Sequence, residues 1–77
     1  MTGADLKQKR AVAGIPGRLL CARAKMHRSR LSHIERGYVR GSEEELVRIE
    51  RVLNDLIQKK QKLVEMATEV GWPVEAL

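Results

Sequence analysis

The spacing of apolar residues between positions 15 and 37 constrains the fold of this chain more than any other feature. Apolar residues fall at Leu20, Ala24, Met26, Leu31 and Ile34, with small Cys21 beside Leu20, and these five are separated by four, two, five and three positions. Steps of three and four keep side chains on one face of a helix, whereas the two-residue step breaks that phase. The pattern fits neither one continuous helix nor a strand. It predicts two short helices whose apolar faces meet across a turn near Lys25.

Several residues of this segment also match a known family pattern. They are Gly14, Ile15, Leu20, Cys21, Met26, Ser29, Leu31 and the closing run Ile34-Glu35-Arg36-Gly37. Together they resemble the lambda-repressor-like, Cro-type (XRE) helix-turn-helix pattern, and the likeness extends from about Leu6 to Leu53. The resemblance implies a DNA-binding regulator, in which one helix braces the unit and the next enters the major groove.

The length and composition predict a small all-α protein. The 77 residues contain no Phe, and Trp72 and Tyr38 are the only aromatic residues, so the core must consist of smaller apolar side chains. We expect a four- to five-helix lambda-repressor-like helix-turn-helix domain over residues 1–54. Residues 55–77 form a C-terminal helix and tail for dimerisation or packing. Pairing with a second copy would add stability to so small a core.

The single cysteine and the N-terminal sequence indicate a cytoplasmic protein, and the family resemblance implies that it acts at the bacterial nucleoid or in a phage-infected cell. Cys21 cannot form an internal disulfide, and no N-terminal apolar run suggests a signal peptide or membrane span. We interpret Cys21 as a small buried hydrophobic residue. No metal or other cofactor is expected, because His27 and His33 point to different sides of a helix and no Cys or acid completes a site.

The charge is unevenly distributed between the two halves of the sequence. Residues 1–41 contain ten Lys or Arg against Asp5 and Glu35, which gives +8, whereas residues 42–77 contain five against eight acids, which gives −3. A basic lobe that carries the helix-turn-helix pattern is typical of a protein that binds the phosphate backbone of nucleic acid. Basic charge alone is also common on a solvated surface.

Local signals predict where the helices begin and end. We expect helices over 3–13, 16–24 and 28–36, followed by a fourth that begins after residue 42. Thr2 caps the first helix and Gly14 ends it in a left-handed conformation. Ser42 caps the fourth, with Glu45 closing a capping box. Lys25 replaces the usual turn glycine, so the turn is either strained by about 1 kcal/mol or has another geometry.

The outer face of the 28–36 helix is the predicted reading surface. The expected base-reading residues are Arg28, Ser29, Ser32 and His33, and the expected phosphate contacts are the Gly17 backbone, Arg18, Arg30, Arg36 and Arg40. A solvated basic face is the alternative. The resemblance further implies a structural ion pair between Arg10 and Glu35, unless both are solvated. Tyr38 either binds a phosphate or packs on its loop.

The C-terminal third carries a wide apolar stripe with a seven-residue recurrence at Ile49, Leu56, Leu63 and Val70. The expected dimer interface is Leu56, Leu63, Val64, Ala67, Val70 and Trp72. Packing on the chain's own helices and a membrane-surface helix are the alternatives. The sequence leaves open whether residues 43–70 form one helix or two with a break at Asn54-Asp55.

From these observations we expect a homodimeric DNA-binding transcription factor, a repressor of an inverted-repeat operator, with double-stranded DNA and itself as partners. The alternative is a protein-interaction module, such as an antitoxin or phage-encoded adaptor, with a protein partner at the C-terminal helix. No membrane partner is expected. An enzyme is not expected either, because the sequence offers no nucleophile with a base and orienting group, and too little chain for a substrate pocket.

Overall fold

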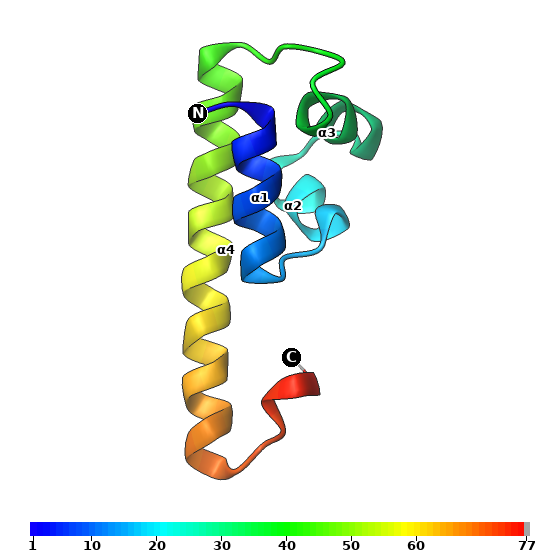
Figure 1. Cartoon of the computed structure of the whole chain (residues 1–77). Helices are drawn as coiled ribbons and strands as arrows, with labels where there is room; N and C mark the ends of the chain where they lie inside the picture. Colours follow the sequence, from blue (N-terminus) through cyan, green and yellow to red (C-terminus); the bar gives the residue numbers. More distant parts are fainter. Residues whose placement is uncertain (77) are drawn as a thin grey trace.

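A computed structural model describes residues 1–76, which form four α-helices and a short 3-10 turn. The helices are α1 (Gly3–Ala13), α2 (Gly17–Ala24), α3 (Arg28–Glu35) and α4 (Glu43–Val70), and the turn is η1 (Val74–Ala76). Figure 1 shows α1, α2 and α3 gathered beside one half of α4, while its other half extends beyond them and the tail turns back. The expected all-α, lambda-repressor-like fold class is confirmed. No strand occurs among these 76 residues, and no helix there is long and apolar enough to cross a membrane.

The first helix has the predicted bounds, and its N-terminus carries one more capping hydrogen bond than the sequence suggested. The Thr2 hydroxyl accepts a hydrogen bond from the Asp5 backbone N–H, and the Asp5 carboxylate accepts one from the Thr2 N–H. This reciprocal capping box lowers the pKa of Asp5 through hydrogen bonds with Thr2. Gly14 ends the helix at φ 69°, as expected. The chain therefore leaves α1 in a left-handed turn that directs it into α2.

The turn between α2 and α3 resolves the question raised by Lys25. That residue has φ 55° and ψ 52°, the left-handed conformation, and it is the one residue other than glycine with positive φ in the described chain. The strained alternative is therefore the observed one. Helix α2 begins at Gly17, one residue later than expected, because Pro16 is extended and serves as its N-cap. Helix α3 ends at Glu35, one residue earlier than expected.

Helix α4 is continuous across Asn54-Asp55, which answers the question left open by the sequence. Ser42 accepts a hydrogen bond from the Glu45 N–H at its start, and Gly71 closes its end at φ 75°. The Glu45 side chain does not close a capping box, because Arg30 holds its carboxylate. The division into residues 1–54 and 55–77 stays a prediction. Helix α4 crosses that boundary without a break.

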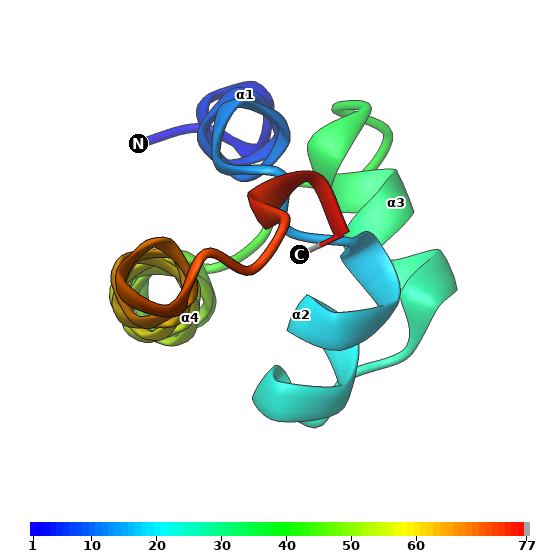
Figure 2. The same cartoon turned by 90° about the horizontal axis from the view of Figure 1, so that it is seen from below.

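The core lies between the N-terminal half of α4 and the three short helices (Figures 1 and 2). Its buried members are Leu6, Ile15, Leu20, Cys21, Leu31, Ile34, Ile49, Leu53 and Leu56. Leu56 and Ala67 were expected at a dimer interface, but each is 8% exposed in the single chain, and Leu56 packs in this core. Both side chains are therefore covered within their own chain, and the expected interface stays a prediction.

A close contact between backbones brings α1 against the end of α3. A Cβ atom built on Gly3 would collide with the carbonyl group of Ile34. Only a residue without a side chain allows this approach. The N-terminus of α1 thus fixes the C-terminal end of α3.

Candidate nucleic-acid interface

Helix α3 has one face in the core and one face open to solvent. Leu31 and Ile34 are each 2% exposed and hold the inner face. On the outer face, Arg28, Ser29 and His33 are exposed, while Ser32 is only half-buried. The view along α4 in Figure 2 shows α3 on the side of the bundle away from that helix, whereas α2 lies closer to α4. The four predicted base-reading residues therefore share one helix, but Ser32 is less accessible than the other three.

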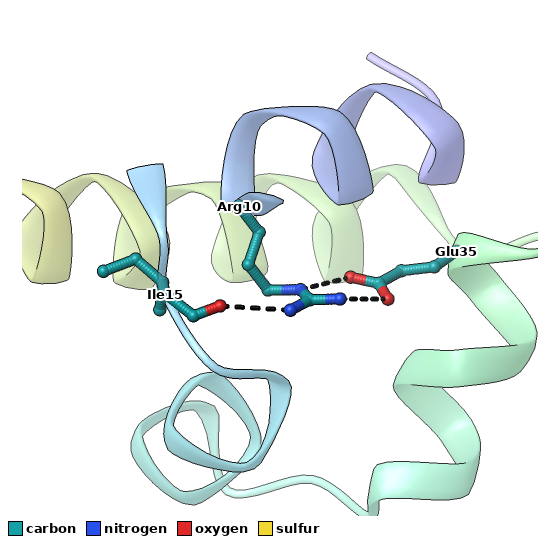
Figure 3. A network of polar contacts seen from close by, with 3 residues as sticks. All are labelled: Arg10, Ile15 and Glu35. Atoms are coloured by element: carbon teal, nitrogen blue, oxygen red, sulfur yellow. Dashed lines mark hydrogen bonds and ion pairs between the residues drawn. The ribbon is translucent and has the colours of Figure 1, made fainter. Parts of the chain in front are cut away.

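A largely buried ion pair fixes the position of α3. Arg10 donates from Nε and Nη2 to the two carboxylate oxygens of Glu35, at 2.8 and 3.0 Å. Its remaining Nη1 donates to the Ile15 carbonyl oxygen at 3.0 Å (Figure 3). The hydrogen bond to Glu35 raises the pKa of Arg10 above its ordinary value. One guanidinium group thus joins α1, the connection to α2 and the end of α3 in a geometry that the planar fork suits.

Both members of this pair are largely shielded from water. The side chain of Arg10 is 18% exposed and that of Glu35 is 7% exposed. In such surroundings the loss of one partner leaves a charge without compensation. The pair expected by resemblance is therefore present and holds the angle at which α3 leaves the core.

Arg30 has a partner within the chain that the sequence did not suggest. It was expected to hold a phosphate, but it donates from Nη2 and Nε to the Glu45 carboxylate at 2.8 and 3.2 Å. The hydrogen bond from Arg30 lowers the pKa of Glu45 below its usual range. Arg30 is 43% exposed and lies at the flank of α3. The contact ties α3 to the first turn of α4 and occupies one of the five expected phosphate contacts.

His33 and Tyr38 form a small aromatic contact at the end of the reading face. Their ring centroids are 6.0 Å apart and the planes are inclined by 49°. The Tyr38 backbone N–H donates to the His33 carbonyl oxygen at 2.9 Å. Of the two alternatives for Tyr38, the structure has the ring beside His33, although 71% of the residue stays exposed. The loop thus limits the positions open to the imidazole.

The remaining candidate phosphate contacts lie around the ends of α2 and α3. Arg18, Arg36 and Arg40 are exposed. Arg18 is in the first turn of α2, Arg36 caps α3, and Arg40 borders a hollow beside the N-terminus of α1. Gly17 is half-buried and lies against the guanidinium of Arg10.

Two features of this region were missed in the sequence. The first is the Arg30–Glu45 pair, which joins residues fifteen positions apart. It was missed because the sequence analysis assigned the Glu45 side chain to a capping box. Arg23, Lys25 and Arg51 line a hollow between α2 and α4 together with Asp55, and none of these residues was a predicted site residue. Cys21 is buried, and burial raises the pKa of its thiol, which agrees with its interpretation as a small hydrophobic residue.

Comparison with known proteins covers the same part of the chain. A family model described as helix-turn-helix matches residues 6–56, which is more than half of the 77 residues. No curated protein and no solved structure matches the chain. The match ends at Leu56, the last α4 residue of the core cluster, so the C-terminal part of α4 lies outside it.

Proposed function

Since the chain belongs to the XRE-type helix-turn-helix family of DNA-binding transcriptional regulators, we propose that it is a homodimeric repressor that reads an inverted-repeat operator through α3. The observation that carries the proposal is the exposed outer face of α3, with Arg28 and Ser29 at its N-terminal end. That end of a recognition helix enters the groove most deeply. The core and the Arg10–Glu35 pair hold the opposite face.

The outer side chains differ in how much sequence information they can provide. Arg28 can donate two hydrogen bonds to O6 and N7 of guanine, which distinguishes guanine from the other bases in the major groove. Ser29, Ser32 and His33 can donate or accept at several base edges and therefore discriminate less. The contact with Tyr38 and the half-buried position of Ser32 support Arg28 and Ser29 as the main reading pair.

Phosphate contacts set the register of the protein on the duplex. We assign this role to Arg18, Arg36, Arg40 and the Gly17 backbone N–H, which lie beside the reading face. Arg30 can join them only if a phosphate displaces the Glu45 carboxylate. Each phosphate neutralised makes the logarithm of affinity fall more steeply with the logarithm of salt concentration.

The two-fold symmetry of the proposed homodimer determines the form of its operator. Two copies related by a two-fold axis require two inverted half-sites whose centres are about 34 Å apart, or a multiple of the helical repeat. The exposed apolar side chains of Leu63, Met66 and Val70 support self-association through the end of α4. Bound over a promoter, such a dimer would exclude RNA polymerase, and control would come from its own concentration.

The test uses Arg28→Ala, with Arg48→Ala on the exposed part of α4 as the matched control. Against a panel of duplexes from site selection, Arg28→Ala should cost about 1 to 3 kcal/mol at one base position and relax the preference there. The control should bind as the native protein does. A uniform loss on every sequence would make Arg28 a phosphate contact, and binding that ignores added salt would contradict the proposal as a whole.

A second function has one observation in its favour. Leu63, Met66, Val70 and Trp72 line an apolar groove at the end of α4, outside the family match. If an unrelated protein fills this groove, the chain is an antitoxin or adaptor whose DNA binding serves autoregulation. Sedimentation of the purified chain separates the two functions, since the repressor self-associates, whereas the adaptor sediments as a monomer until its partner is added.

A further inference from the structure

The chain turns back directly after α3 and brings Tyr38 beside the last turn of that helix. Gly37 has φ 80°, in the left-handed region, and its N–H donates to the Ile34 carbonyl oxygen at 3.1 Å. The backbone N–H groups of Tyr38 and Val39 both donate to the His33 carbonyl oxygen, at 2.9 and 3.3 Å. This is the hydrogen-bond pattern of a helix that ends at a left-handed glycine, and it ties the residue after the glycine to the last turn. The position of the Tyr38 backbone is therefore set by α3 itself.

The same turn places the phenol ring beside the imidazole of His33. The two ring centroids are 6.0 Å apart and the planes are inclined by 49°, within the range of favourable tilted aromatic pairs. Tyr38 is not among the core residues of the described part of the chain, and 71% of it is exposed. Its packing therefore contributes little to the stability of the fold. What the ring does is to occupy one side of the His33 imidazole.

The orientation of an imidazole decides which base it can read. Each ring nitrogen either donates or accepts a hydrogen bond, and the base pairs differ in the order of donors and acceptors in the major groove. An exposed histidine without a neighbour samples several staggered rotamers and can meet more than one base edge. A ring packed on one side removes some of these rotamers before DNA binds, so less conformational entropy is lost in the complex. A held imidazole should therefore discriminate between bases better than a free one.

We propose that Tyr38 is a positioning residue, whose ring orients the His33 imidazole so that it reads one defined base pair. The inference rests on the function proposed above, in which the outer face of α3 enters the major groove, and it adds a residue outside α3 to the specificity. Arg28 remains the main source of selectivity, and His33 adds a further base pair along the groove. A phosphate contact from the Tyr38 hydroxyl is the competing role, and it would strengthen binding to every sequence alike.

Nuclear magnetic resonance of the imidazole protons tests the packing without DNA. The chain has two histidines, and His27 caps the opposite end of α3, so its signals are the internal control. Tyr38→Leu keeps an apolar side chain but removes the aromatic ring, and the His33 signals should then shift because the magnetic field of the ring is lost. Tyr38→Phe keeps the ring and should leave them close to their native positions. If the His33 signals do not move in Tyr38→Leu, the inference is overturned, whatever the protein does with DNA.

Binding to a panel of duplexes, each with one base pair of the selected site replaced, tests the reading role. Tyr38→Leu should reduce the preference about three- to tenfold at the base pair where His33→Ala also reduces it, which is the magnitude of one aromatic pair. Because Tyr38 acts through His33, the double variant should lose no more selectivity than His33→Ala alone. Tyr38→Phe should retain the preference, since it retains the ring.

The possible results separate this inference from the function on which it rests. Additive losses from Tyr38→Leu and His33→Ala would overturn the inference alone. So would an equal loss on every duplex in Tyr38→Phe, because the hydroxyl would then be a phosphate contact. A native chain that binds all duplexes alike would overturn the proposed function and the inference with it. Far-UV circular dichroism of each variant checks that a loss of selectivity is not a loss of folding.

Discussion

The two halves of α4 share one amphipathic pattern and differ in what covers it. Over residues 43–56, the core-facing apolar residues are buried, and Ile49 and Leu53 have no accessible surface. Over residues 57–70, the small residue Ala67 is 8% exposed, whereas the large residues Leu63 and Val70 are 53% and 75% exposed. The helix itself continues through both halves without a break.

The difference comes from the length of the other helices. Helices α1, α2 and α3 have 11, 8 and 8 residues, whereas α4 has 28, or about 42 Å at 1.5 Å per residue. Three short helices cannot cover so long a surface. A hydrophobic pattern therefore identifies the face that will be covered, but it does not identify the molecule that covers it.

The largest effect should follow from removing a buried side chain in the first half. Leu53→Ala is expected to reduce the free energy of unfolding by about 2 to 5 kcal/mol, because it leaves a cavity between α4 and the short helices. Leu63→Ala is the matched control, and at a protein concentration below self-association it should change stability by less than about 1 kcal/mol. Urea denaturation measures both. Equal losses would show that the two halves do not differ in the single chain.

Self-association should depend on the exposed second half of α4 and not on its buried first half. Leu63→Lys places a charge among the exposed apolar side chains at the end of α4 and is expected to raise the dissociation constant of the proposed dimer by tenfold or more, which is about 1.4 kcal/mol. Thermal stability of the dilute monomer should stay as it is. Analytical ultracentrifugation over a concentration series gives the constant. A dimer that tolerates Leu63→Lys would have its interface elsewhere.

Lys60 marks the junction between the two halves. Its Nζ donates to the Ala13 carbonyl oxygen at 2.9 Å, so a positive charge meets the C-terminal end of α1. Lys60→Met keeps the length of the side chain and should lower the free energy of unfolding by about 1 kcal/mol. Lys62→Met, two positions later at an exposed site, is the control and should change it little. Urea titrations of both proteins test whether this bond matters.

The smallest effect concerns the start of α4. Glu45→Gln weakens the contact with Arg30 and should lower stability at neutral pH by a few tenths of a kcal/mol, as is usual for accessible pairs. Because the pKa of Glu45 is depressed in the folded chain, this contribution is present above the ordinary value of 4.5 and disappears as pH falls through the lower folded value. Native and variant stabilities should therefore converge below about pH 4.

The same variant also tests the relation between Arg30 and DNA. Freed from its carboxylate, Arg30 can reach a phosphate, and the salt dependence of binding should then steepen by about one unit of slope. Glu44→Gln, at an exposed position beside it, controls for the loss of one negative charge. If both variants show the same salt dependence of binding, Arg30 remains away from the phosphate backbone of the DNA.

Much of the candidate site follows from short stretches of sequence. Apolar steps across residues 20–34 predict which side of α3 is buried, and Gly14 and Ser42 predict a helix end and a helix start. The pair between Arg10 and Glu35 came from the family resemblance, since no local spacing connects positions 25 residues apart. The partner of Arg30 was missed because the sequence around a charged residue at the flank of a helix is the same whether it faces solvent or another side chain.

What the sequence determined by itself was the set of helices, their caps and the faces they bury, because those depend on interactions within a few residues. Tertiary structure alone decided that α4 is unbroken, that Leu56 belongs to the core, and that Glu45 holds Arg30. Each of these depends on which surfaces meet in space. That is set by the relative lengths and angles of helices that lie far apart along the chain.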